Sequence, residues 1–208
     1  MAVTVVSHPL AQHLLRELRD KDTPPASFRT AARKLASALM LDASADVPTQ
    51  EVSVTTPLEE TTGSSLTRPI VLVPVLRAGL GMLDGVIDLF PLVRVGYIGL
   101  ERDEATFEPN EYYSKLPRLD DAAVFVLDPM LATGGSASAA LDAVKREGAT
   151  WVRMVCVVAA PEGVKLLERD HPDVDVYTAA VDRELSDKAY ILPGLGDFGD
   201  RLFGTFDS

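Results

Sequence analysis

The stretch 122–148 constrains the fold most, because it joins a buried strand to a helix through a glycine-rich loop. Its first six residues, 122–127, are all apolar, and so short a run without polar alternation predicts a central strand covered on both faces. The strand should end at Asp128-Pro129, because proline has no N–H to extend the hydrogen-bond ladder. After two adjacent glycines, apolar residues recur at helical spacing until Gly148, which is suited to ending a helix.

This order of strand, acid, glycine loop and helix is suited to holding a phosphate group. The N-terminus of a helix presents unpaired N–H groups to an anion, and glycines let the backbone close around it without Cβ clashes. The hydroxyls of Thr133 and Ser136 add donors, and Asp128 is placed to hold sugar hydroxyls or a metal ion. The loop is neither a Walker A motif nor a dinucleotide fingerprint, since the lysine and the G-x-G-x-x-G spacing are absent. Its composition alone leaves an ordinary tight turn as an equal alternative.

Four segments together resemble the type I phosphoribosyltransferases, and in particular the uracil phosphoribosyltransferases. The first is 124–136, in which the Asp-Pro pair at 128–129 stands in place of two consecutive acids, and the others are 73–82, 155–163 and 190–197. The resemblance covers nearly the whole chain, and four ordered motifs are more specific than any one of them. It implies the type I phosphoribosyltransferase fold, an α/β doubly wound parallel sheet.

The resemblance also implies which residues bind the substrates. Those expected to bind 5-phosphoribosyl diphosphate are Arg77, Arg102, Asp128, Pro129, Met130, Leu131, Ala132, Thr133, Gly134, Gly135, Ser136 and Asp197. Backbone groups of Ile191, Gly196, Asp197 and Phe198 are expected to bind uracil.

Arg102, on the diphosphate, and Asp197, near the base, are the catalytic candidates. No direct protein ligand is assigned to Mg²⁺, which should arrive with the donor, with Asp128 or Asp197 as its contact. Phe198 departs from the family, which usually has a small residue there. We expect its ring to anchor the local structure rather than to narrow the base pocket.

The remainder of the chain alternates between strand and helix patterns. Strands are expected at 3–6, 47–57, 69–75, 93–100, 122–127, 151–160 and 174–180, and helices at 8–20, 24–42, 80–89, 137–147 and 161–170. Such alternation independently predicts a doubly wound parallel sheet with helices on both faces. The polar segment 55–63 predicts a surface arm.

Two further segments lack a regular pattern. The segment 101–119 is too long for an ordinary connection and predicts a hairpin or flap, which the resemblance places over the active site. From 181 onward, glycine and proline argue against any helix or long strand, whereas the apolar and aromatic residues argue against a frayed tail. We therefore expect an ordered hood at 181–208, formed together with the N-terminal segments, within a single domain of 1–208.

Charge and composition exclude several classes of function. The net charge of −11, from 31 acidic and 20 basic residues, argues against nonspecific nucleic-acid binding. An anionic substrate must then be held by local N–H dipoles, a few arginines and a divalent cation. No apolar run approaches ~18 residues, and the N-terminus lacks the basic region of a signal peptide, so we expect no membrane span. The single cysteine, Cys156, lies in an apolar run and fits a buried, inert thiol in a cytoplasmic protein.

The leading hypothesis is that the protein converts uracil and 5-phosphoribosyl diphosphate to UMP and diphosphate, a step of pyrimidine salvage. One alternative is an RNA-binding pyrimidine regulator on the same fold, against which the negative charge argues. Another is a purine phosphoribosyltransferase, against which the match of 190–201 argues. The resemblance implies a homodimer or a higher homo-oligomer, and it leaves open whether GTP acts as an effector.

Overall fold

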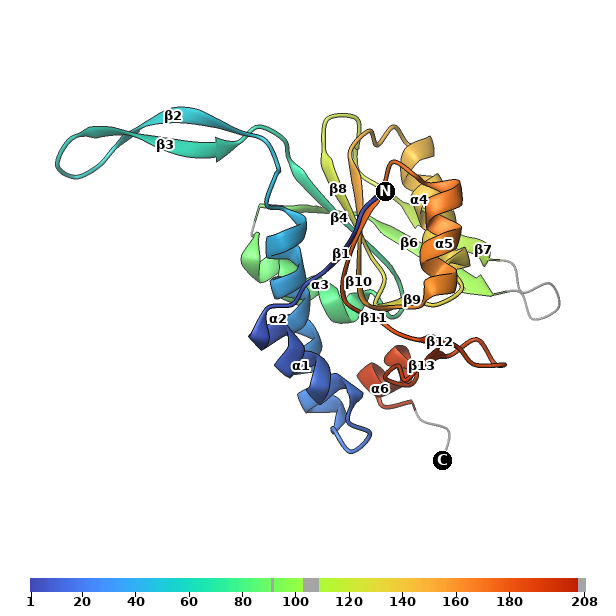
Figure 1. Ribbon diagram of the computed structural model, residues 1–208. Coiled ribbons are helices and arrows are strands. Elements are labelled where there is room, and N and C mark those ends of the chain that lie inside the picture. The colour runs from blue at the N-terminus through green and yellow to red at the C-terminus, as the bar shows by residue number, and fades with distance from the viewer. Residues whose placement is uncertain (91, 103–108, 206–208) are drawn as a thin grey trace.

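The computed structural model describes residues 1–90, 92–102 and 109–205, and its centre is a mixed, mostly parallel sheet (Figure 1). The strand order is β1-β11-β10-β8-β4-β6-β7, with β5 beside β4 and β9 beside β10, and only β7 runs antiparallel to its neighbour. The strands of this sheet are β1 (Val3–Val5), β4 (Ile70–Leu76), β5 (Arg94–Val95), β6 (Tyr97–Arg102), β7 (Pro109–Lys115), β8 (Ala123–Leu127), β9 (Met130–Leu131), β10 (Val152–Ala159) and β11 (Asp175–Val181).

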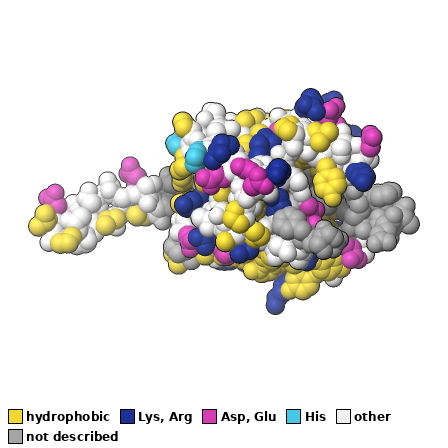
Figure 2. Space-filling view, turned by 90° about the horizontal axis from the view of Figure 1, so that it is seen from below, with side chains coloured by type: hydrophobic (Ala, Val, Ile, Leu, Met, Phe, Trp, Pro, Cys, Tyr) yellow, Lys and Arg dark blue, Asp and Glu magenta, His cyan; other side chains and the backbone are white. Residues whose placement is uncertain are grey.

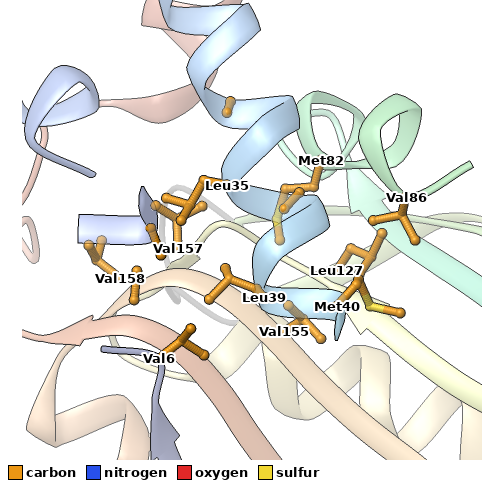
Figure 3. Close-up of a cluster of buried hydrophobic side chains, with 14 of the residues drawn as sticks. Val6, Leu35, Leu39, Met40, Met82, Val86, Leu127, Val155, Val157 and Val158 are labelled. Atoms are coloured by element: carbon orange, nitrogen blue, oxygen red, sulfur yellow. The ribbon is translucent and has the colours of Figure 1, made fainter. Parts of the chain in front are cut away.

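Helices cover both faces of the sheet, as the alternating pattern predicted (Figure 1). On one face lie α1 (Pro9–Arg19), α2 (Pro25–Ala43) and α3 (Leu80–Leu89), and on the other lie α4 (Gly135–Arg146) and α5 (Pro161–Asp170). Each face has its own buried apolar cluster. Figure 3 shows Leu35 and Leu39 of α2 pointing toward Val155 and Val157 of β10. None of the helices in the described ranges is long and apolar enough to cross a bilayer.

The central strands bring the candidate residues to one edge. In β8 and β10 every residue is buried, as expected for apolar runs covered on both sides. Parallel pairing aligns Pro74 of β4 with Leu127 of β8, and Leu127 with Val155 of β10. The segments that follow β4 and β8, which contain Arg77 and Asp128, therefore leave the sheet at the same edge. Open α/β sheets bind ligands at this edge.

Two local predictions need correction, and one short strand was not predicted. The buried strand β8 ends at Leu127, just before Asp128-Pro129 as predicted, and Met130–Leu131 then form the unpredicted strand β9 beside β10. The expected strand at 93–100 is two strands, β5 and β6. The surface arm predicted at 55–63 is the outer end of an antiparallel hairpin of β2 (Thr49–Thr55) and β3 (Glu60–Leu66), which projects from the body (Figure 1). Residues 60–65 carry no apolar side chain, so no alternation of polar and apolar residues marked β3 as a strand.

The C-terminal segment has regular structure within its described residues, 181–205, and the prediction that it contains no helix was wrong. It forms two short paired strands, β12 (Glu184–Leu185) and β13 (Ile191–Leu192), and the helix α6 (Phe198–Phe203). The Asp197 carboxylate caps α6 by accepting a hydrogen bond from the Asp200 N–H at 2.9 Å. Phe198 and Leu202 are buried, and a Cβ on Gly81 of α3 would lie within 2.9 Å of both side chains. Tertiary packing and one cap therefore outweigh the low helix propensity of the segment.

Candidate active site

The loop between β9 and α4 forms a polar cavity at the N-terminus of α4. Gly134 precedes the helix with φ of +90°, a left-handed conformation that strongly favours glycine. As a glycine it has no side chain to cap the first-turn N–H groups, which stay available to an anion. The cavity measures about 190 Å³ and is lined by Asp128, Met130, Leu131, Ala132, Thr133, Gly134, Ser136 and Ala137. Seven of the nine predicted donor-binding positions in 128–136 thus line one hollow, and the other two, Pro129 and Gly135, are their neighbours in the chain.

Gly134 is required for a reason that the sequence did not reveal. A Cβ at this position would lie 3.1 Å from the Gly163 carbonyl oxygen and 3.2 Å from the Leu166 Cβ, both on α5. The loop composition had suggested that a Cβ here would clash with a bound anion. In the structure the added atom would instead press on α5. Gly163 is equally confined, because its Cβ would lie 2.6 Å from the Ala132 carbonyl oxygen. The loop is thus held in shape by close backbone packing against the first turn of α5.

Asp128 is the acidic group of this cavity. Its carboxylate is largely desolvated, and burial raises the pKa of Asp128 to about 6. The Met130 N–H, 3.4 Å from Oδ1, opposes the shift only weakly. No described cation forms a salt bridge with Asp128. An acid with an unusually high pKa, placed beside an uncapped helix N-terminus, suits a group that gains its partner only when a ligand binds.

Arg77 lies at the carboxyl end of β4, where the sequence placed it. Its side chain is exposed, and its guanidinium carbon lies 5.7 Å from the centre of the Phe203 ring of α6. No carboxylate pairs with Arg77 in the part of the chain that the structure describes. The guanidinium is therefore open to an anionic ligand. Arg102, the second predicted arginine, ends β6, but its side chain lies outside the described residues, as does 103–108 of the predicted flap.

A second cavity, of about 240 Å³, lies between the glycine loop and the C-terminal segment. Its lining residues are Ala78, Met130, Ala132, Ala189, Tyr190, Ile191, Gly196, Asp197, Phe198 and Gly199. All four residues predicted to bind uracil are among them. The other contributors from the C-terminal segment, Ala189, Tyr190 and Gly199, were not predicted. Tyr190 lies within a recognised motif, whereas nothing in the sequence marks Ala189, a non-glycine residue with φ of +60°.

Phe198 contributes to this cavity while its ring packs elsewhere. The side chain is 1% exposed, and its ring makes an edge-to-face contact with Phe28 of α2 at 5.1 Å between centroids. Gly196 and Asp197 just before it are exposed. The anchoring role expected for this ring agrees with its burial.

The two cavities share Met130 and Ala132 as a common wall. One has helix N–H groups and a carboxylate, and the other has an exposed backbone beside apolar side chains. A ligand with a phosphate at one end and a flat polar ring at the other would span them. Among the described residues, no three His, Cys, Asp or Glu side chains are grouped to hold a metal ion. A divalent cation would then have to share its coordination with ligand phosphates, as Mg²⁺ usually does.

Comparison with known proteins accords with this geometry. The family model for uracil phosphoribosyltransferase matches residues 5–205. The chain is 51% identical over 203 residues to the uracil phosphoribosyltransferase of Streptococcus mutans, covering 97% of each chain. It is also 51% identical over 205 residues to that of Symbiobacterium thermophilum, covering 98% of each.

Solved structures agree with the fold. The AQ2163 protein from Aquifex aeolicus superposes with a TM-score of 0.94 at 39% identity, covering 99% of this chain and 100% of that one. A hypoxanthine phosphoribosyltransferase from Trypanosoma cruzi shares only the fold, with a TM-score of 0.51 at 12% identity over 78% of this chain and 76% of that one. Since one family model and half-identical relatives span almost its entire length, the chain belongs to the uracil phosphoribosyltransferase family.

Proposed function

We propose that the protein transfers the phosphoribosyl group of 5-phosphoribosyl diphosphate to N1 of uracil, giving UMP and diphosphate. The observation that carries this proposal is the pair of adjoining cavities with the shared Met130–Ala132 wall. The phosphate end of UMP fits the N-terminus of α4, and its base fits the cavity under the C-terminal segment. The family membership supports the same reaction.

Catalysis here consists mainly of positioning and charge stabilisation. The amides at 133–136 hold the 5′-phosphate, and the Asp128 carboxylate accepts hydrogen bonds from the ribose hydroxyls. Arg77 and Arg102 bind the diphosphate, whose departure leaves positive charge on C1′. Held between the two cavities, C1′ is presented to N1 of uracil at close range. Asp128 or Asp197 would hold an Mg²⁺ ion that arrives with the donor, and the ion would supply charge neutralisation on the leaving diphosphate.

Selection of uracil follows from backbone recognition. Uracil offers an N3–H donor between two carbonyl acceptors, whereas cytosine reverses this pattern at two positions. Backbone groups at Ile191 and 196–198 cannot change their donor or acceptor character, so cytosine would leave buried polar groups unpaired, at a cost of factors of about 10⁴. The exposed Asp197 carboxylate lies beside this edge, where it can orient the base or a water molecule.

A base-specificity assay tests the proposal. The purified protein is incubated with the sugar donor, Mg²⁺ and one of four bases: uracil, cytosine, thymine or hypoxanthine. Formation of UMP from uracil, with the other bases turned over at least about 10³-fold less efficiently, is the expected result. Preferential formation of IMP would contradict the proposal and favour purine specificity.

We also propose that the protein is a homo-oligomer that uses the β2–β3 hairpin as a contact. A hairpin of two strands is marginally stable alone in water, and this one stands clear of the body (Figure 2). It exposes Leu58 at 95% and Val54 at 42%. A groove of about 640 Å³ at its base, which includes Leu66 and Leu92, offers a second copy an apolar surface. Light scattering should give a lower molecular mass in solution for the double variant Val54→Asp/Leu58→Asp than for the unaltered protein. Equal masses for the two proteins would contradict the proposed contact.

For a GTP effector, we propose the hollow between α2, α3 and α6. It measures about 500 Å³ and is lined by Arg29, Thr30 and Arg33 of α2, by Asp84 of α3 and by apolar residues of α3 and α6. Two exposed arginines on one helix face give an acidic protein a local anion-binding surface. Calorimetric titration with GTP should give binding that Arg29→Ala/Arg33→Ala abolishes. Binding that the double variant retains would place the effector elsewhere.

A further inference from the structure

The turn that carries the base-binding residues is held by an ion pair outside both cavities. Arg19, the last residue of α1, donates from Nη1 to Asp182 Oδ2 at 2.8 Å and from Nη2 to Oδ1 at 2.7 Å. The same Nη1 donates to the Gly194 carbonyl oxygen at 2.8 Å, and Asp182 Oδ2 accepts from the Gly194 N–H at 2.9 Å. The Gly194 carbonyl oxygen thus accepts from Arg19, and the Gly194 N–H donates to Asp182.

Gly194 occupies the tightest point of this turn. It has φ of +60°, and a Cβ there would lie 2.1 Å from the Ile191 carbonyl oxygen, which excludes any other residue. Ile191 precedes the turn and Gly196 follows it, so Gly194 sets the distance between the two parts of the base-binding backbone. Fixing its N–H and its C=O at once fixes the orientation of the whole turn.

Asp182 connects this turn to the rigid sheet. Its own N–H donates to the Ala159 carbonyl oxygen at 2.8 Å, at the end of β10. Its side chain is only 5% exposed, so the carboxylate has few alternative partners. The chain of contacts therefore runs from β10 through Asp182 and Arg19 to Gly194, and so to the edge that faces the base.

We infer that Arg19 and Asp182 are positioning residues that set the affinity for the pyrimidine base while leaving donor binding unchanged. This inference rests on the proposed function, since it assigns the base to the cavity beside the turn. Neither side chain lines that cavity or the anion cavity. Their effect on the base must therefore pass through the two peptide units on either side of Gly194.

The arrangement indicates positioning and not stability alone. A buried ion pair contributes little net stability, because desolvation offsets most of its attraction. What this pair provides is two charge-assisted hydrogen bonds of fixed direction, one to each of the two peptide units that flank the Gly194 Cα. Arg201 of α6 supports the adjacent residue by donating to the Leu195 carbonyl oxygen at 2.7 Å, and it also donates to the Leu18 carbonyl oxygen at the end of α1. Residues at the end of α1 therefore hold the turn at both Gly194 and Leu195.

Steady-state kinetics of three variants test the inference. Arg19→Met removes both bonds from the guanidinium, and Asp182→Asn keeps an acceptor for the Gly194 N–H while losing the charge. If either single variant folds poorly, the double variant Arg19→Met/Asp182→Asn takes its place, because it leaves no unpaired buried charge. The matched control is Arg183→Ala, which breaks the exposed Arg183–Glu184 pair next in the chain.

We expect the uracil KM to rise by about tenfold or more in Arg19→Met, because a charge-assisted bond to the turn is lost. The KM for the sugar donor should stay within about twofold, and Asp182→Asn should lie between Arg19→Met and the wild type. Arg183→Ala should match the wild type. Equal rises in both KM values, or an unchanged uracil KM in the folded double variant, would overturn the inference. A wild type that forms no UMP would instead reject the proposed function.

Discussion

Replacing Asp128 with asparagine should make the ligand-free protein more stable. Burial raises the pKa of this carboxyl from 3.8 to about 6. A raised carboxyl pKa means that the folded protein disfavours the charged form. Its contribution to the free energy of unfolding is therefore greatest below pH 3.8 and is lost as pH rises through about 6.

The magnitude follows from the pKa difference. A difference of about two units corresponds to about 3 kcal/mol at pH 8, where Asp128 is ionised in both states. At pH 4.5 the folded protein is already protonated there, and the difference falls to about 1 kcal/mol. Asp128→Asn removes this cost, so the free energy of unfolding should rise by about 3 kcal/mol at pH 8 and by about 1 kcal/mol at pH 4.5.

Urea unfolding of the wild type and of Asp128→Asn, at pH 8 and at pH 4.5, measures these differences in the free energy of unfolding. The control is Asp187→Asn, an exposed position in the C-terminal segment, which changes net charge equally and should alter stability by less than about 0.5 kcal/mol. Donor affinity should fall in Asp128→Asn and stay unchanged in the control. If Asp128→Asn gains no more stability than the control at pH 8, the carboxylate is not desolvated and its proposed role loses its basis.

The other predictions concern the loop, the arginine and the ring. Gly134→Ala forces an alanine to φ near +90° and should cost about 1–2 kcal/mol of stability while weakening donor binding by calorimetry; unchanged donor affinity would contradict the loop assignment. Arg77→Ala should leave the melting temperature unchanged and lower kcat/KM for the donor by at least about tenfold, far beyond an exposed surface charge. Phe198→Ala should cost about 3–5 kcal/mol and raise the uracil KM without admitting thymine. Activity on thymine with an unaltered melting temperature would show instead that the ring limits the base pocket.

Sequence reasoning succeeded where burial alone sets structure. The runs that became β8 and β10 have no polar residue except Arg153, and such segments have few alternatives to a central strand. Arg153 is buried between the rings of Trp151 and Tyr177 and forms an ion pair with Asp46. The glycine loop was recognised from its composition and from the family resemblance, and the structure then gives Gly134 a φ of +90°.

Sequence reasoning failed where distant contacts decide. α6 exists because Phe198 and Leu202 pack on helices more than a hundred residues away in the chain. The orientation of Gly134 toward α5 depends on the packing of Gly163, which no local pattern reveals. The same holds for the Arg19–Asp182 pair, whose members are 163 positions apart. The residues proposed to bind the base were predicted from family resemblance, because backbone recognition leaves no side-chain signature.

A crystal structure with bound UMP tests the central claim most directly. The account predicts the 5′-phosphate within hydrogen-bond distance of the amides at 133–136, and the base edge against the backbone of Ile191 and 196–198. The ribose should lie over the wall that Met130 and Ala132 form between the two cavities. UMP bound in the hollow beside Arg29 and Arg33, with both cavities empty, would contradict the account.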